Sequence, residues 1–244
     1  MPEVDMSEVT ESDNTAMMDK KADTALAYPI DDFGGLTGEV TSDDTRVPTL
    51  NIVHGVGPLS EHFDPGSLVY NKELVVAEGS KEGTKNPIEI VVVAAHKDYL
   101  ERVEWGSESL PRSADTEEEV RALGGTTQYN GDERPSWDKR LTCLILIKGA
   151  EGAPCFDYHI GGEWWAPAMW VIKGPSQWRA AGTHIVTAAK MGLRNFGGLP
   201  GGRWSLSVRR QKIGDNFVYV PAITSAGKNL AEFVHEVREL GLSL

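Results

Sequence analysis

The chain has 244 residues, of which 40% are hydrophobic and 25% are charged, with 24 Lys and Arg against 36 Asp and Glu. This composition supports one large domain with a hydrophobic core and excludes a disulfide-rich miniprotein, a collagen-like fibre and a fully disordered chain. No apolar run approaches about 18 residues, so we expect no transmembrane helix, and residues 1–13 are too acidic for a signal peptide. The two cysteines lack metal-type spacing and indicate a reducing, cytoplasmic compartment.

The net charge of −12 is distributed unevenly along the chain. Residues 1–45 contain 12 acids and 2 bases, whereas residues 160–212 contain eight bases and a single acid, Glu163. Concentrated like charges repel each other and cost stability unless an anionic partner offsets them. The basic segment therefore favours an anionic partner such as a nucleic acid. The alternative, that its cations pair with acids of residues 46–159 across the fold, stays open at this point.

Residues 1–44 are polar and acidic and show no hydrophobic periodicity, so we predict a mostly disordered tail. From residue 45 onward, short apolar runs separated by Gly and Pro indicate a mainly β domain. Thr116 and Glu119 have the spacing of a capping box and predict a short helix in a loop-rich stretch. In this first half of the domain we expect strands at residues 49–54, 68–70, 74–77, 88–95 and 141–148.

The second half continues with a strand at residues 164–172 and a helix at 176–193, where small residues favour close packing on a sheet. Two strands, 203–210 and 216–223, flank a hairpin turn at Gly214-Asp215. An amphipathic helix follows near residues 230–240. We predict a mainly β fold with α additions, a barrel or sandwich of short antiparallel strands that forms a single domain over residues 45–244.

Motifs for enzymatic chemistry are missing from the sequence. There is no Gly-rich phosphate loop ending in Gly-Lys-Ser/Thr and no Gly-x-Ser-x-Gly elbow, and the six histidines are scattered without metal-type spacing. The acidic clusters fall in the tail or at a helix start, where exposed charge is the simpler interpretation. We therefore predict a protein that is not an enzyme and has no cofactor or metal. An active site assembled from distant residues is the alternative.

Aromatic residues coincide with the basic segment, which contains five of the seven tryptophans. Single-stranded nucleic acids bind where bases stack on aromatic rings and cations follow the backbone. Trp164 and Trp165 are neighbours in a strand and point to opposite faces, so at most one is fully buried. In the strand at residues 203–209, alternation directs Trp204 into the core and Arg203 and Arg209 outward.

The sequence thus yields two sets of candidate binding residues. Phosphate contacts are expected from Lys173, Arg179, Arg203, Arg209, Arg210 and Lys212. Base stacking is expected from Trp164, Trp165 and Trp170, with Tyr219 as a lesser candidate.

Several short patterns resemble a group of bacteriophage replication-region proteins that bind single-stranded DNA through an OB-like fold. The resemblance covers about residues 35–225 and depends on diffuse patterns rather than on one motif. Its components are residues 35–44, residues 47–53, Pro65-Gly66 before Tyr70-Asn71, Lys97-Asp98-Tyr99 with Trp105, and Trp178-Arg179 followed by Trp204-Ser205-Leu206.

The resemblance implies an OB-like barrel that coats single-stranded DNA without sequence specificity during phage replication and recombination, in the host cytoplasm. Asp31, Asp32 and Phe33 resemble the acidic, Phe-containing tip through which such proteins recruit replication or recombination partners. That tip often lies at the carboxyl end, so here the role would have changed ends. A homo-oligomer is compatible with this interpretation, and no membrane partner is expected. The alternative is a phage structural or host-interaction protein that acts through the acidic amino-terminal tail.

Overall fold

The computed structural model describes residues 47–242 except 105 and 108, and this part of the chain forms one unit. The predicted tail at residues 1–44 lies outside the described residues. The main sheet begins with an antiparallel meander of three long strands, and a hairpin then pairs with the other edge of the first strand. These strands are β6 (Ile88–Glu101), β8 (Trp137–Gly149), β10 (Glu163–Lys173), β11 (Gly202–Ile213) and β12 (Asn216–Lys228).

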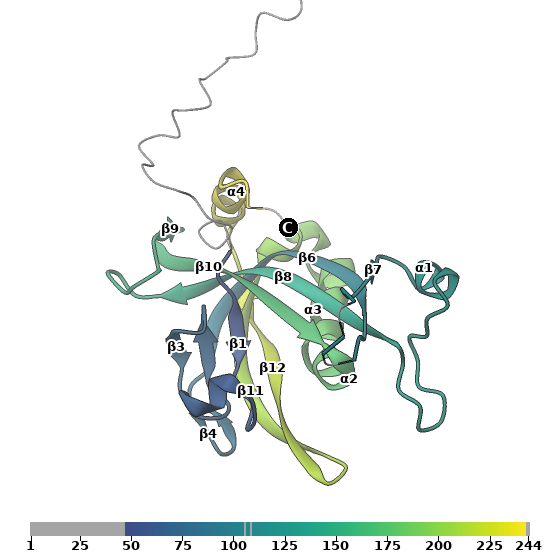
Figure 1. Ribbon diagram of the computed structural model, residues 1–244. Helices are drawn as coiled ribbons and strands as arrows, with labels where there is room; N and C mark the ends of the chain where they lie inside the picture. The colour runs from purple at the N-terminus through teal and green to yellow at the C-terminus, as the bar shows by residue number, and fades with distance from the viewer. Residues whose placement is uncertain (1–46, 105, 108, 243–244) are drawn as a thin grey trace, which may run out of the picture. The chain divides into compact units, whose positions relative to one another are not determined.

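A meander followed by a helical segment and a returning hairpin is the arrangement of an OB-like barrel. The sheet curls so strongly that β11 and β12 lie across from β10 and β8 (Figure 1). The result is a half-barrel of antiparallel strands with helical additions, which confirms the predicted fold class.

Shorter strands complete the barrel. A second sheet contains three of them, and its first strand is joined to β10 by a parallel bridge between Thr49 and Met169. The others extend the edges of the main sheet. The short strands are β1 (Leu50–Ile52), β2 (Leu68–Tyr70), β3 (Leu74–Ala77), β4 (Gly79–Ser80), β5 (Gly83–Thr84), β7 (Ser113–Ala114) and β9 (Tyr158–Ile160).

Gly83 shows why β5 can approach β11 so closely. Its φ of 134° is unfavourable for other residues, and a Cβ at this position would lie 2.0 Å from the carbonyl oxygen of Val208. The glycine therefore permits the pairing of β5 with β11 at Arg209.

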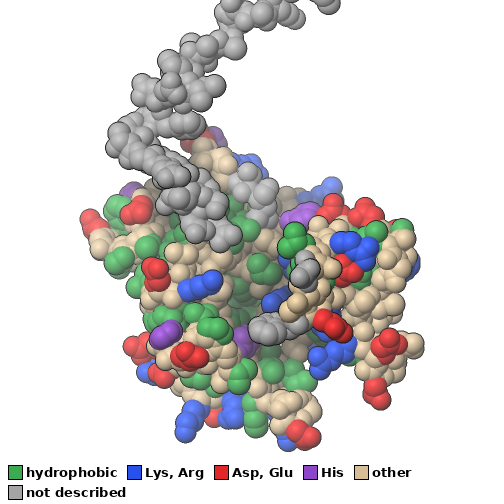
Figure 2. All heavy atoms as spheres, viewed as in Figure 1, with side chains coloured by type: hydrophobic (Ala, Val, Ile, Leu, Met, Phe, Trp, Pro, Cys, Tyr) green, Lys and Arg blue, Asp and Glu red, His purple; other side chains and the backbone are tan. Residues whose placement is uncertain are grey.

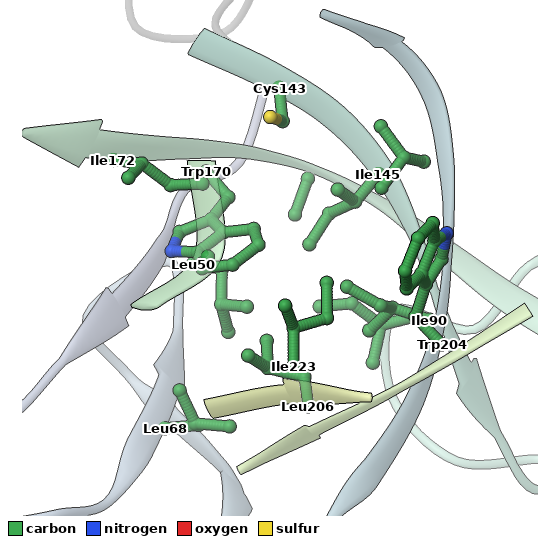
Figure 3. Close-up of a cluster of buried hydrophobic side chains, with 14 of the residues drawn as sticks. Leu50, Leu68, Ile90, Cys143, Ile145, Trp170, Ile172, Trp204, Leu206 and Ile223 are labelled. Carbon is green, nitrogen blue, oxygen red and sulfur yellow. The ribbon is translucent and has the colours of Figure 1, made fainter. Parts of the chain in front are cut away.

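The core lies inside the curl of the sheet, where side chains from the long strands meet those of β1 and β2 (Figure 3). Alternation along β10 and β11 directs Trp170, Ile172, Trp204 and Leu206 into this core. Trp204 is 7% exposed, which confirms its predicted core position, and Cys143 is fully buried.

The helical segment after β10 is continuous but mixed. It consists of α2 (Gly174–Gln177), a π-helical turn (Trp178–Gly182), α3 (Thr183–Thr187) and a second π-helical turn (Ala188–Gly192). The Thr183 hydroxyl donates a hydrogen bond to the Trp178 carbonyl at 3.2 Å, which supports the wider first π turn. The helix predicted at residues 176–193 is confirmed, and small residues within it, Ala181 and Gly182, are buried.

Two further helices and three short 3-10 turns complete the described elements. α1 (Glu117–Ala122) begins as predicted, because the Thr116 side chain accepts a hydrogen bond from the Glu119 amide. α4 (Ala231–Glu239) covers the outer face of the sheet, where Phe233 packs against Trp165. The 3-10 turns are Pro58–Glu61, Arg194–Phe196 and Leu199–Gly201. None of the helices in the described part of the chain is both long and apolar enough to span a bilayer.

Candidate nucleic-acid interface

A groove of about 380 Å³ lies beside β10 where β1 approaches it. The two strands are held together at this point by the bridge at Met169, whose amide donates to the Pro48 carbonyl at 2.7 Å. Because alternate residues of β10 enter the core, Val171 and Lys173 face away from it and into the groove. The β1–β10 groove is lined by residues that include Asn51, His54, Arg140, Met169, Val171 and Lys173.

Positive charge in the β1–β10 groove comes mainly from Lys173. This side chain is exposed and forms no ion pair with any described residue. Arg140 is neutralised, since its Nε donates to Asp98 at 3.0 Å in a bidentate pair. Burial, and then the charge of Lys173, lower the pKa of His54. His54 is therefore neutral at pH 7, and its ring offers one hydrogen-bond donor and one acceptor. Among the described residues, the groove therefore combines one cation that has no ion-pair partner with apolar and neutral polar groups.

The hairpin between β11 and β12 projects beyond the sheet (Figure 1). We call its outer part, residues 209–217, the hairpin arm. Arg210 lies opposite Tyr219 and Lys212 opposite Phe217, so these residues share one face of the arm. The Arg210 guanidinium lies 3.6 Å from the centroid of the Phe217 ring, which is 53% exposed. The arm thus presents an aromatic ring among cations.

A second hollow, of about 330 Å³, lies at the start of β8 and the start of the helical segment. We call it the Trp178 hollow. The Lys139 ammonium lies 3.7 Å from the centroid of the Trp178 ring, and Tyr129 is 54% exposed at the rim. α2 borders both hollows, because its Gln177 lines the groove while its Gly174 and Pro175 line the Trp178 hollow.

Five of the six predicted phosphate-binding cations have the environment that the prediction requires. They are exposed and form no ion pair with residues that the structure describes. Figure 2 shows one face of the molecule, where Lys and Arg side chains lie around hydrophobic ones and Asp and Glu are interspersed. The five cations are Lys173, Arg179, Arg209, Arg210 and Lys212.

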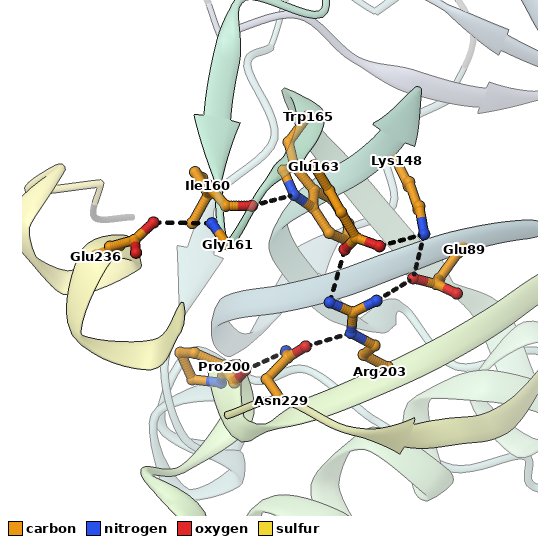
Figure 4. A network of polar contacts seen from close by, with 10 residues as sticks. All are labelled: Glu89, Lys148, Ile160, Gly161, Glu163, Trp165, Pro200, Arg203, Asn229 and Glu236. Carbon is orange, nitrogen blue, oxygen red and sulfur yellow. Dashed lines mark hydrogen bonds and ion pairs between the residues drawn. The ribbon is translucent and has the colours of Figure 1, made fainter. Parts of the chain in front are cut away.

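Arg203 is the exception, because other protein groups occupy its guanidinium (Figure 4). It pairs with Glu89 at 2.8 Å and with Glu163 at 2.6 Å, and its Nε donates to the side chain of Asn229. Glu163 also pairs with Lys148 at 2.5 Å. The expectation of an outward-facing, phosphate-binding Arg203 is therefore corrected: two carboxylates already neutralise this cation. For Arg203, the alternative interpretation therefore holds, in which a cation of the basic segment pairs with an acid such as Glu89 across the fold.

The predicted stacking residues differ in exposure. Trp165 and Trp170 are 0% and 1% exposed, so neither ring presents a face to a base and both are removed from the candidate set. Tyr219 is 8% exposed and donates its hydroxyl to the Lys81 carbonyl at 3.2 Å, which removes it as well. Trp164 is half-buried and lies 4.9 Å from the His159 ring. As predicted, only one of the adjacent pair Trp164 and Trp165 is fully buried.

Sequence reasoning missed three aromatic residues that the structure brings next to cations. Trp178 falls within the helix predicted at residues 176–193, and its helical spacing does not indicate that its ring borders the Trp178 hollow. Tyr129 lies in a loop without periodicity, so no pattern indicated its exposure. Phe217 did carry a signal, since it is the second residue after the predicted turn at Gly214-Asp215, which places it across the ladder from Lys212.

One predicted set of contacts remains, and it concerns protein partners. Asp31, Asp32 and Phe33, the predicted partner-binding residues, lie outside the described residues. Within the described part of the chain, no three His, Cys, Asp or Glu side chains gather as a metal site would need.

Comparison with known proteins does not extend this description: no family model, no curated protein and no solved structure matches the chain.

Proposed function

We propose that the protein binds single-stranded DNA without sequence specificity and has no enzymatic activity. In this role it coats single strands during phage replication and recombination in the host cytoplasm. The acidic amino-terminal segment, through Asp31, Asp32 and Phe33, recruits replication or recombination proteins.

The observation that carries the proposal is the position of the β1–β10 groove on the OB-like barrel. OB folds bind oligonucleotides on the face of the second and third strands of the barrel, between the loop that joins the first two strands and the loop that joins the last two. Here those strands are β8 and β10, and the final loop is the tip of the hairpin arm. Lys173 therefore lies on the face that this fold uses for oligonucleotides.

The chemistry of the surface supports the same ligand. Five exposed cations without a described ion-pair partner provide electrostatic contacts to phosphates, and Phe217 and Tyr129 are exposed rings on which bases can stack. Duplex DNA keeps its bases stacked inside the helix and so gains only the electrostatic part. The expected preference is therefore for single strands.

The proposal is tested by fluorescence anisotropy with labelled oligo-dT and with a duplex of equal length. If five phosphates are neutralised, the logarithm of the affinity falls with the logarithm of salt concentration at a slope of about −3.5. Duplex binding should be much weaker than oligo-dT binding. Equal or tighter duplex binding, or a slope near zero, contradicts the proposal.

Charge variants locate the binding surface. Lys173→Glu should weaken oligo-dT binding and flatten the salt slope, because it reverses the free charge of the groove. Lys190→Glu is the matched control, since Lys190 is an exposed lysine of the same basic segment that lines neither the groove nor the Trp178 hollow. Equal losses in the two variants would show that net charge, and not the groove, determines affinity.

A further inference from the structure

The Trp178 ring has one closed face and one accessible face. On the closed side, a Cβ added to Gly182 would lie 3.1 Å from Cε3 of the indole, so the ring rests directly on the helix backbone. On the other side lies the Lys139 ammonium, at the end of a flexible side chain. A planar group can therefore reach Trp178 only from the side of Lys139.

Cations accumulate beside this accessible face. Lys139 lies opposite Tyr99, and the Lys97 ammonium lies 4.9 Å from the Tyr99 ring centroid, which brings the two lysines to the same region of the sheet. Burial, and then the charge of Lys97, lower the pKa of Lys139. Glu117, the acid that opposes this shift, is already paired with Arg121 and accepts a hydrogen bond from the Tyr99 hydroxyl. An anion at this place would relieve the repulsion between the lysines.

Aromatic and polar groups complete the hollow. Tyr129 and Trp178 both line it, together with the hydroxyl-bearing Thr127 and the exposed cation Arg179. Its volume of about 330 Å³ falls at the lower end of the range for small-ligand pockets. Asp138 also lines the hollow, but its carboxylate is paired with Arg102 at 2.5 Å. A flat, apolar ring with an attached phosphate therefore matches both the shape and the remaining charge of this lining.

We propose that the Trp178 hollow holds one unstacked base of a bound single strand, stacked on Trp178 and Tyr129, with its phosphate near Lys97, Lys139 and Arg179. The inference rests on the proposed function and makes it more specific, because it routes the strand from the β1–β10 groove over α2 into the hollow. The base takes the place of the Lys139 ammonium on the indole. The displaced ammonium remains within reach of the phosphate, so its interaction with the ring is exchanged for one with the ligand.

Photocrosslinking tests the location directly. Oligo-dT in which single thymidines are replaced by 5-iododeoxyuridine is irradiated in complex with the full chain, and the crosslinked peptides are mapped by mass spectrometry. The proposal expects crosslinks at Tyr129 or Trp178 from one position of the bound strand. Crosslinks confined to other residues, in a strand that still binds, overturn the assignment of the hollow and leave the proposed function intact.

Binding measurements with ring variants provide the second readout. Tyr129→Leu should weaken oligo-dT binding about fivefold or more, which is the lower part of the range for one stacked base, while Tyr129→Phe should bind like the wild type. Phe196→Leu is the matched control, because Phe196 also lies under a lysine, Lys228 at 3.3 Å, but borders neither hollow. Thermal unfolding of each variant verifies that the fold is intact.

A free nucleotide has the same chemistry as a base of a strand, so thymidine monophosphate forms the second arm. The proposal expects it to bind far more weakly than oligo-dT and to compete poorly for the crosslink. Thymidine monophosphate binding as tight as that of the strand, together with protection of Tyr129 from crosslinking, overturns the strand assignment in favour of a free-nucleotide site. Failure of the wild type to bind oligo-dT at all refutes the proposed function and this inference together.

Discussion

Arg203 and Glu163 form an ion pair of 2.6 Å between two strands that are not neighbours in the sheet. Arg203 is the second residue of β11 and Glu163 is the first of β10, and β6 and β8 lie between these strands in the sheet order. Glu89 of β6 and Lys148 of β8 complete the row of charges (Figure 4). The row therefore links four strands at one end of the half-barrel. The positive charges of Arg203 and Lys148 are neutralised within the fold by Glu89 and Glu163.

Arg203→Ala is expected to lower stability without lowering DNA affinity. It leaves two half-buried carboxylates, Glu89 and Glu163, with Lys148 as their remaining described partner, which costs about 1–3 kcal/mol of unfolding free energy. Arg209→Ala, at an exposed position of the hairpin arm, should change stability by no more than about 0.5 kcal/mol and should flatten the salt dependence of binding. Urea unfolding and fluorescence anisotropy with oligo-dT, measured on both variants, check these two expectations. A stable Arg203→Ala protein that has lost DNA binding would contradict it.

Acid should weaken the same row of charges. Burial alone would raise the pKa of Glu163, but the hydrogen bonds from Arg203 and Lys148 outweigh it and hold the pKa below the ordinary value of 4.5. This carboxylate therefore stabilises the folded state fully above about pH 4.5, and the contribution is lost as the pH falls through the lowered pKa.

The pH prediction is measured as the difference in unfolding free energy between wild type and Glu163→Gln from pH 7 to pH 3. The wild-type advantage should shrink as the pH falls below 4.5, because the protonated acid resembles the amide. A difference that stays constant over this range would mean that Glu163 makes no pH-dependent contribution.

Trp204 should tolerate a smaller aromatic ring better than a truncation. Trp204→Ala leaves a cavity in the core and is expected to cost about 3–5 kcal/mol. The indole Nε1 is buried and has no hydrogen-bond partner among the described residues, so Trp204→Phe also removes an unsatisfied donor. We expect Trp204→Phe to lose less than half as much stability as Trp204→Ala in thermal or urea unfolding. Equal losses would show that indole packing, rather than cavity size, dominates.

The charge of the amino-terminal segment leads to a prediction about regulation. Residues 1–45 carry 12 acids and 2 bases, and a tethered polyanion competes with DNA at a high effective concentration. Deleting residues 1–30 should tighten oligo-dT binding at low salt, with the gain shrinking as salt screens the charges. Anisotropy across a salt series measures the effect. Unchanged affinity at every salt concentration would leave the segment only a role in solubility or in partner recruitment.

Most strands could be predicted from the sequence, because short apolar runs bounded by Gly and Pro are local signals. The residues at which the strands end could not be predicted in this way. β6 continues past the apolar run at residues 88–95 to Glu101, since its outer half is held by pairing with β8 and by the burial of Tyr99 in a separate cluster. The π turns could not be predicted for a similar reason, because the spacing of Gly182 and Ile185 indicates a helix but not its local winding.

The candidate site was less predictable than the fold. Which cations are free depends on register between distant segments, and nothing near Arg203 in the sequence indicates that Glu89 lies 2.8 Å away. Burial of Trp165 likewise depends on the placement of Phe233 in α4. The Trp178 hollow combines a loop residue, Tyr129, with a helix that begins more than forty residues later. Sequence patterns report composition, whereas these features are set by tertiary contacts.

Among the described residues, the backbone of the hairpin arm pairs with the rest of the barrel only near its base, where β5 meets β11 at Arg209. The Arg210 amide donates to the Glu82 carbonyl at 2.9 Å, and beyond this residue the ladder of β11 is paired with β12 alone. A two-stranded ribbon has little stability of its own, so its amides should exchange with solvent far sooner than those of β6 and β8. The arm can thus open and re-form while the barrel stays folded. Under the proposed function, a single strand that contacts the arm would be released by local opening of the arm, at a cost set by a few hydrogen bonds and independent of the stability of the core.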